Sequence, residues 1–235
     1  MDFDTGKQKR LPKIIGLFFI CDVLIIIMYL SNHLINYPID WFSDFIDIDN
    51  ENNLPAWYSA IQLFTLSIFL GIFAIDFSDS KNPLTRLVWF VPLLFLFMSL
   101  DEIAMIHETL GEYSDFLLAG GSRRNTPFRV TGIWMFLFGI PFFILLTAMI
   151  FYLKQKFNNI PGVIKKYYLG LIVYVGSAAG IEIFSNFYRR GSAYLAQVCI
   201  EEFGEMLGVT ILLWATLELL HFRGIFFTNL FSPRS

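Results

Sequence analysis

The sequence predicts an all-α membrane protein, with six transmembrane helices in one bundle and both termini in the cytoplasm. Three observations lead to this prediction. The 235 residues are 56% hydrophobic and only 16% charged, whereas soluble domains are about one quarter charged. Their mean hydropathy is +0.59. Several apolar runs reach the ~20 residues that a helix needs to cross a ~30 Å hydrocarbon core.

Six apolar segments qualify as spans, and helix-breaking residues lie between them. The first run continues without a small-residue cleavage site, so we interpret it as a retained helix and not as a signal peptide. Pro55, Pro83 and Pro161 fall in or beside connections. Pro92 and Pro141 fall inside spans, which membrane helices tolerate. Residues 1–235 are therefore predicted to form a single domain, with spans at about 14–36, 56–76, 87–111, 129–153, 166–188 and 194–221.

Positive charge beside the spans predicts the orientation, because cytoplasmic loops carry an excess of Lys and Arg. With the N-terminus inside, twelve of the seventeen Lys and Arg residues lie on the inner side and five on the outer side. The first outer loop, 36–55, has five acids and no basic residue. Both termini are therefore expected in the cytoplasm.

Ionisable residues interrupt three of the spans at one expected depth. At ~1.5 Å rise per residue, Asp101 lies roughly 21 Å from the inner end of its helix and Glu182 about 24 Å from the inner end of its own. Glu201 lies roughly 10 Å below the outer surface, because its helix runs inward. Since a charge at such a depth needs a partner, a cation or water, we expect these stretches to meet at one site that opens toward the periplasm or exterior.

When residues are placed 100° apart, the polar residues of the third helix fall within about 120° of one helix side, and those of the fifth and sixth form one stripe each. These faces also carry small residues, such as Gly204 and Gly208, which let membrane helices approach closely. We therefore expect the polar faces to point into the bundle. They are formed by Asp101, His107 and Glu108 on the third helix, Glu182 and Asn186 on the fifth, and Glu201, Glu202 and Glu205 on the sixth.

A carboxylate cluster of this kind does not ionise fully without compensation, because like charges raise one another's pKa. The first solution is a divalent metal ion (Zn, Mn, Fe or Ca), which suits carboxylates with one imidazole. The second is proton sharing, as in pumps and transporters. The third is a network of salt bridges to the outer arginines. The metal interpretation predicts as ligands Asp101, Glu108, Glu182, Glu201 and Glu205.

The leading functional hypothesis is a metal-dependent membrane hydrolase or transferase that acts on an anionic lipid or lipid-linked substrate. Glu202 would act as general base on a metal-bound water, and His107 as a further ligand or proton shuttle. Polar side chains at the outer rim would bind the anionic group of the substrate. Besides membrane lipid, membrane-protein partners are open, and the net charge of −3 gives no basis for nucleic-acid binding. The predicted substrate-binding residues are Arg123, Arg124, Asn186, Arg189 and Arg190.

Two alternatives use the same acids without this chemistry. The first is a proton- or cation-coupled transporter. Against it, the inner halves of the spans offer only the isolated Asp22, which we interpret as a buried hydrogen-bonding group, and no inverted repeat is visible. The second alternative is an accessory subunit of a larger membrane complex, which fits a chain with almost no soluble mass.

The first outer loop contains the spacing Asp47-x-Asp49-x-Glu51, which opens a calcium-binding loop. The glycine required at the sixth position is absent, and Tyr58 stands where the closing glutamate belongs. We therefore interpret this loop as a solvated acidic segment.

Two sets of motifs resemble known membrane proteins. The run Asp47-Ile-Asp49-x-Glu51-x-Asn53-Leu54-Pro55-x-Trp57-Tyr58-Ser59, followed by Leu100-Asp101-Glu102 and His107-Glu108, resembles a set of functionally unassigned bacterial multi-pass membrane proteins. This resemblance implies a location in the cytoplasmic (inner) membrane and adds no activity. The residues Glu182-x-x-x-Asn186, Arg190 and Glu201-x-x-x-Glu205 are more loosely similar to VanZ-like membrane proteins. There, glutamates stand where Asp and Asn are expected, and Asn186 replaces a glutamine.

Overall fold

The computed structural model describes residues 12–77, 88–118, 120–128, 133, 135–156, 162–187 and 191–225, which form helices and no strands. The long helices are α1 (Lys13–Leu34), α3 (Leu54–Phe77), α4 (Phe90–Ala104), α6 (Ile140–Lys156), α7 (Val163–Val175) and α9 (Gly191–Phe222). The short ones are α2 (Asp40–Phe45), α5 (Ile106–Ser114), η2 (Asp115–Leu117), η3 (Arg123–Asn125) and α8 (Glu182–Ser185), with π-helical turns η4 (Met135–Gly139) and η5 (Gly176–Ile181).

Within the described residues, four helical segments are long and apolar enough to cross a membrane. They are Lys13–Leu34, Leu54–Phe77, Val163–Ser185 and Ala193–Phe222. A fifth is added when the bent pair of α4 and α5 is counted as one span, while α6 has a shorter apolar stretch, Ile140–Tyr152. The described part of the chain is thus all-helical, with four to five candidate spans where the sequence predicted six.

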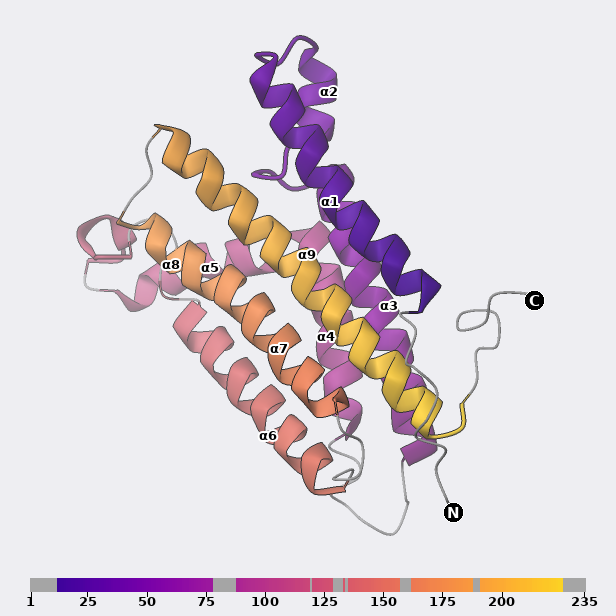
Figure 1. Cartoon of the computed structure of the whole chain (residues 1–235). Helices are drawn as coiled ribbons and strands as arrows, with labels where there is room; N and C mark the ends of the chain where they lie inside the picture. Colours follow the sequence, from indigo (N-terminus) through magenta and orange to yellow (C-terminus); the bar gives the residue numbers. More distant parts are fainter. Residues whose placement is uncertain are drawn as a thin grey trace.

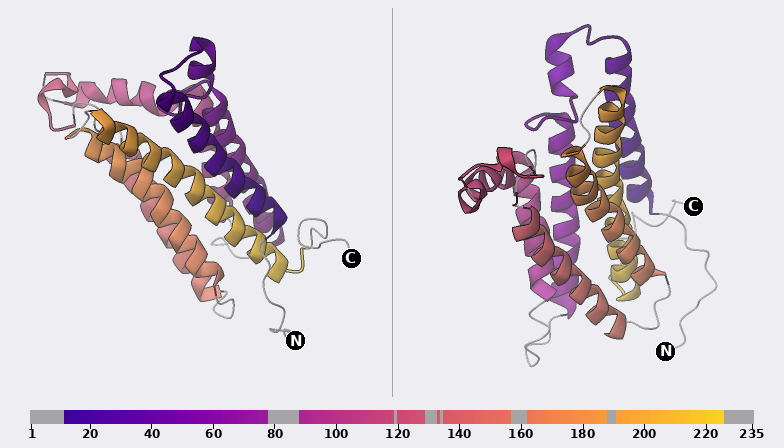
Figure 2. Two further views of the ribbon diagram at one scale, coloured as in Figure 1. Left: turned by 45° about the horizontal axis from the view of Figure 1, so that its top comes forward. Right: turned by 90° about the vertical axis from the view of Figure 1, so that its left-hand side faces the viewer.

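Helix α9 is the centre of the bundle. It packs along α7 on one side and against α3 and α1 on the other, while α4 packs on α3 and α6 on α7 (Figure 1). Both views of Figure 2 keep α9 between α1 and the α6–α7 pair. The most apolar window of α9 is 72% buried, against 22% for α1. Helix α9 is therefore covered by protein, whereas α1 leaves most of its surface uncovered by the rest of the chain.

Two glycines set the spacing between α7 and α9. A Cβ atom at Gly208 would lie 2.7 Å from the backbone of Tyr174, and one at Gly204 would collide with the Ser177 side chain. The two helices are therefore close beside the polar face of α9, as the small residues in the sequence indicated.

The third predicted span, 87–111, is broken at Met105. Helix α4 ends at Ala104, Met105 adopts a left-handed conformation (φ 52°, ψ 38°), and the chain turns by 83° into α5. Asp101 stabilises both sides of the break. Its carbonyl oxygen accepts the N–H of Met105 at 2.8 Å, and its side chain accepts the N–H of His107 at 2.7 Å. The bond from the His107 N–H to the Asp101 side chain takes the place of a helical hydrogen bond, so the predicted continuous helix is interrupted there.

A buried polar network joins α1, α3 and α9. The carboxyl group of Asp22 is fully buried and accepts hydrogen bonds from Tyr58 (2.5 Å), Gln62 (2.8 Å) and Thr210 (2.8 Å). This is the hydrogen-bonding role expected for Asp22 from the sequence. The network ties the peripheral α1 to the centre of the bundle.

Candidate metal centre

Glu51 belongs to a loop that is held in shape by its own side chains. The two carboxylate oxygens of Asp47 accept the N–H of Asp49 (3.1 Å) and the amide of Asn50 (2.6 Å). The amide of Asn53 donates to the carbonyls of Asp47 (2.5 Å) and Asn50 (2.7 Å). At the same time its oxygen accepts an N–H from the first turn of α3 at 3.2 Å. The loop is therefore ordered up to the residue that caps α3.

Two long-range contacts dock this loop on the rest of the chain. The Tyr194 hydroxyl on α9 lies 2.7 and 2.8 Å from the carboxylate oxygens of Asp49. The amide of Asn52 donates to the sulfur of Met105 at 3.5 Å. The loop thus lies directly over the break between α4 and α5.

Asp101 fixes the position of His107. One carboxylate oxygen accepts the backbone N–H of His107 at 2.7 Å, and the other lies 2.9 Å from ring atom Nδ1. Without an ion, the His107 ring is paired with Asp101 through Nδ1 and with Glu51 through Nε2. If a metal ion replaced the proton of Nε2, the ring would still donate Nδ1–H to Asp101 and would present the lone pair of Nε2 on its far side. A carboxylate that receives the other ring N–H is the usual support of a metal-binding histidine.

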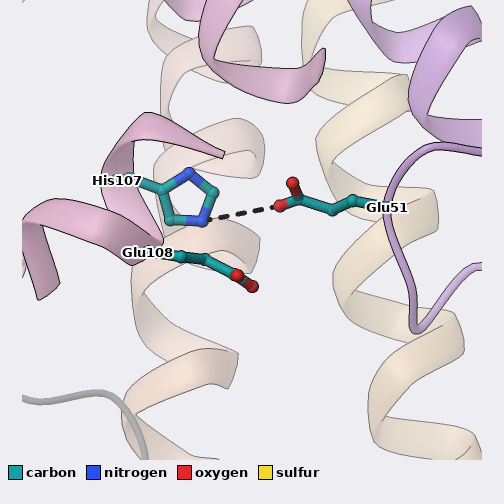
Figure 3. A group of neighbouring side chains, drawn as sticks. All are labelled: Glu51, His107 and Glu108. Carbon is teal, nitrogen blue, oxygen red and sulfur yellow. Dashed lines mark ion pairs between the residues drawn. The ribbon is translucent and has the colours of Figure 1, made fainter. Parts of the chain in front are cut away.

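Three side chains converge at Nε2 of His107, and Figure 3 shows them facing one another from two elements. Glu51 comes from the loop before α3, and Glu108 follows His107 in the first turn of α5. Nε2 lies 3.7 Å from Oε1 of Glu51, and one ligand atom from each residue lies within 4.8 Å of the others. Two ligands on a tetrahedral ion with ~2.1 Å bonds are about 3.4 Å apart. The spacing of His107 and Glu51 is therefore close to what a shared ion requires.

Within the described part of the chain, the carboxyl group of Glu51 has an unsatisfied oxygen and a raised pKa. Its atom Oε2 is buried and has no hydrogen-bond partner among the described residues. Burial raises the pKa of Glu51 to about 7, with His107 acting to lower it and Glu108 and Asp101 to raise it. A bound cation would satisfy the oxygen and favour the ionised carboxylate.

Further acids surround this group from the central helices. The charge of Glu102 on α4 interacts with the charges of His107 and Glu51. Glu202 of α9 lies within reach of Glu102 and Glu51. Glu205 of α9 acts on a residue of α7, as do Glu102 and Glu202. Acids of α4 and α9 therefore face a common region of the bundle, which α7 borders.

The predicted outer arginines have different surroundings. Arg123 forms a salt bridge to Asp115 at 2.8 Å, while Arg124 is exposed and its backbone N–H donates to Ser122 at 3.3 Å. Arg189 and Arg190 lie outside the described residues.

The remaining predicted residues belong to the C-terminal helices. Asn186 is 4% exposed and its amide donates to the carbonyl of Ile183 at 3.2 Å. Glu182 opens α8, and its side chain is outside the described part. Glu201 is half-buried on α9 and lies within electrostatic reach of Glu202.

Glu51 is the residue that sequence reasoning did not assign to the site. The acidic loop was interpreted as solvated, although Asn53 and Pro55 after it form a helix-start signal. That signal fixes the end of the loop two residues beyond Glu51. Both runs behind the resemblance to an unassigned family, 47–59 and 100–108, contribute residues to this one group.

Fold and site together define an all-helical protein in which the described residues include four to five candidate membrane spans and a histidine–carboxylate group at a broken helix. A family described as a domain of unknown function, DUF8692, matches residues 16–220. The chain belongs to this family, which agrees with the predicted membership of a functionally unassigned family. No curated protein and no solved structure matches the chain.

Proposed function

We propose that this chain is a metal-dependent membrane enzyme, with a divalent ion held by His107, Glu51 and Glu108. The observation that supports it is that ligand atoms of these three residues lie within 4.8 Å of one another, with Asp101 orienting the ring from behind. Three protein ligands leave one position of a tetrahedral ion for water or substrate, as in catalytic zinc sites. One imidazole with two carboxylates also suits Mn or Fe.

The ligand set in this proposal changes the roles expected from the sequence. His107 takes the ligand role, one of the two expected for it, Asp101 becomes a positioning residue, and Glu51 is added. A bound divalent ion would lower the pKa of its water, and a nearby carboxylate would take the proton. Glu202 keeps the role of general base proposed from the sequence; what supports it is that its charge and that of Glu51 act on each other across the bundle.

The proposed topology has six crossings, both termini in the cytoplasm and the metal centre on the outer side. The sixth crossing is supplied by η4 and α6, which contain 5 and 17 residues and would extend over ~33 Å. Helix α5 stays on the outer side in this topology, so that α4 and α6 cross in opposite directions. The positive charges beside the inner ends support this orientation.

The proposed substrate is an anionic lipid or a lipid-linked molecule. The metal centre lies at the end of α4 and not in the middle of a span, and a divalent ion attracts phosphate or carboxylate oxygens. Arg124 is exposed on the segment that follows α5. A guanidinium at that place can pair with a phosphate.

The test is the metal content of the purified protein. Wild type, His107→Ala and Glu108→Gln are purified in detergent, dialysed against trace Zn²⁺ or Mn²⁺, and measured by mass spectrometry. Glu112→Gln is the matched control, because Glu112 is an exposed acid on the same helix. We expect about one ion per chain in wild type and control, and its loss in both site variants. A wild type without bound metal, or a His107→Ala variant that keeps it, would contradict the proposal.

A second candidate is a cation- or proton-coupled transporter. It is favoured by one observation: the buried carboxyl group of Asp22 lies on α1 about 14 Å from the start of the helix, near mid-membrane. Flux in proteoliposomes distinguishes the two functions. Transport predicts ion-coupled flux that is lost in Asp22→Asn, whereas the enzyme predicts no flux and an unchanged metal content in that variant.

A further inference from the structure

The segment formed by α5 and η2 leaves the bundle at an unusual angle. Helix α4 packs along α3, which is a candidate span, so its axis follows the direction of the bundle. The segment Ile106–Leu117 turns away from α4 by 83°. If α3 and α4 cross the membrane steeply, this segment runs nearly parallel to the membrane surface. Figure 2 shows α5 extending sideways from the end of α4 in both views.

The polarity of this segment is inverted relative to a helix on a soluble protein. At 100° per residue, Ile106, Leu110, Tyr113 and Leu117 fall within about 60° of one another. Tyr113 is 66% exposed, Leu117 70%, and the neighbouring Phe116 78%. The residues that the segment buries are small, Gly111 and Ser114. Its apolar face therefore points away from the protein, which is favourable only in apolar surroundings.

We propose that α5 and η2 form an interfacial helix that lies along the bilayer surface, with Tyr113, Phe116 and Leu117 immersed at the level where acyl chains begin. The occupant of this apolar face is lipid and not a second protein, because the face continues a lipid-type surface. Helix α4, which precedes this segment, exposes an apolar stripe along one of its sides. That stripe consists of Phe90, Leu93, Phe97 and Leu100.

The other side of the segment fits the aqueous edge of the same interface. Glu108 and Glu112 are exposed on the opposite half of the helix, and Asp115 is bound by Arg123 at 2.8 Å. A tyrosine beside these charges is typical of membrane–water boundaries. The segment thus has the apolar and charged faces of a helix that lies in an interface and does not cross it.

This placement has a consequence for the substrate, which rests on the proposed function. His107 and Glu108 lie in the first turn of α5, so the interfacial helix holds both ligands at head-group depth. A lipid substrate would then present its polar head, and not its acyl chain, to the metal ion. The bond that reacts would belong to the head group.

The experiment measures the depth of single labels in lipid nanodiscs. Cysteines are introduced as Leu117→Cys, Glu112→Cys and Phe64→Cys in a Cys21→Ser/Cys199→Ser background and labelled with an environment-sensitive fluorophore. Phe64 is exposed near the middle of α3 and serves as the deep control. Quenching is compared between lipids that carry a nitroxide near the head group and lipids that carry it near the chain end. Metal content is measured on the same preparations.

We expect the label at Leu117 to be quenched more strongly by the shallow nitroxide, and the label at Phe64 by the deep one. The label at Glu112 should be quenched least by both. Stronger deep quenching at Leu117 would mean that the segment enters the bilayer, and absence of quenching would mean that water or a protein covers it; either result overturns the proposal. Loss of metal binding with shallow quenching intact would reject the proposed function alone.

Discussion

Replacing Glu51 by glutamine removes a buried negative charge and keeps the shape of the side chain. Burial and the neighbouring carboxylates raise the pKa of Glu51 from 4.5 to about 7. Its side chain is only 22% exposed, so water screens this effect weakly. A difference of about 2.5 pKa units corresponds to about 3 kcal/mol. In metal-free protein at pH 8, Glu51→Gln should therefore raise the free energy of unfolding by about 3 kcal/mol.

The pH dependence of this effect has a defined sign. The folded state binds the proton of Glu51 more tightly than the unfolded state, because the pKa of Glu51 is higher after folding. The destabilisation is absent below about pH 4.5, grows as the pH rises toward about 7, and is complete above that value. The advantage of the glutamine should disappear at acidic pH. It should reverse when a divalent ion saturates the site, because the ion binds the ionised carboxylate of the wild type.

Thermal unfolding in detergent, with EDTA at pH 5 and pH 8, measures this difference. Glu112→Gln is again the control for loss of an exposed charge on the other side of the break. We expect Glu51→Gln to unfold several degrees above wild type at pH 8 in EDTA, and below it in saturating Zn²⁺ or Mn²⁺. An equal difference at both pH values, or no difference in EDTA, would refute the reasoning from burial.

Three further substitutions test the parts that support the site. Asp101→Asn leaves one acceptor for two donors of the histidine, so metal affinity measured by titration should fall about 10–100-fold while the protein stays folded. Gly208→Ala places a Cβ 2.7 Å from the backbone of α7 and should lower thermal stability by about 1–3 kcal/mol, whereas Gly71→Ala, with open space around it, should not. Thr210→Val deprives a buried carboxylate of a donor and should cost about 1–3 kcal/mol in the same assay, unlike Thr65→Val at an exposed site.

The helices that span the bundle were predictable because hydropathy records burial in lipid along the chain. Helices α1 and α3 begin and end within about two residues of the predicted spans, as expected from a ~20-residue hydrophobic requirement. Helix α6 was harder to place. Its predicted start falls before η4, and Pro141, which has no N–H to donate, is the second residue after this π-helical turn.

The break at Met105 could not be predicted, because Met is a good helix former and no glycine or proline lies beside it. Local propensity therefore favours a continuous helix. Two contacts of side chains override it: the Asp101 carboxylate accepts the N–H of His107, and Asn52, which donates to the Met105 sulfur, is 53 residues away.

The position of Glu51 was unpredictable for a similar reason. Equal depth within the spans brought Asp101 and Glu202 into one hypothesis, since each residue of a helix adds a fixed rise. The residues of a loop have no fixed rise, so the sequence does not give the depth of Glu51. The contact that docks this loop joins Asp49 and Tyr194, 145 residues apart. Charge and spacing alone gave only the calcium-loop and solvated-loop interpretations.

The broken helix and the candidate metal centre are one structural feature. On a straight helix, Asp101 and His107 would be ~9 Å apart along the axis and would point about 120° away from each other, so their carboxylate and imidazole could not meet. The observed 2.9 Å contact requires the turn at Met105. A left-handed methionine costs on the order of 1 kcal/mol. The two hydrogen bonds that the Asp101 carboxylate accepts from His107 offset that cost. The same carboxylate thus bends the chain out of the bundle and aims Nε2 at Glu51, which is why the candidate metal centre lies where the proposed interfacial helix begins.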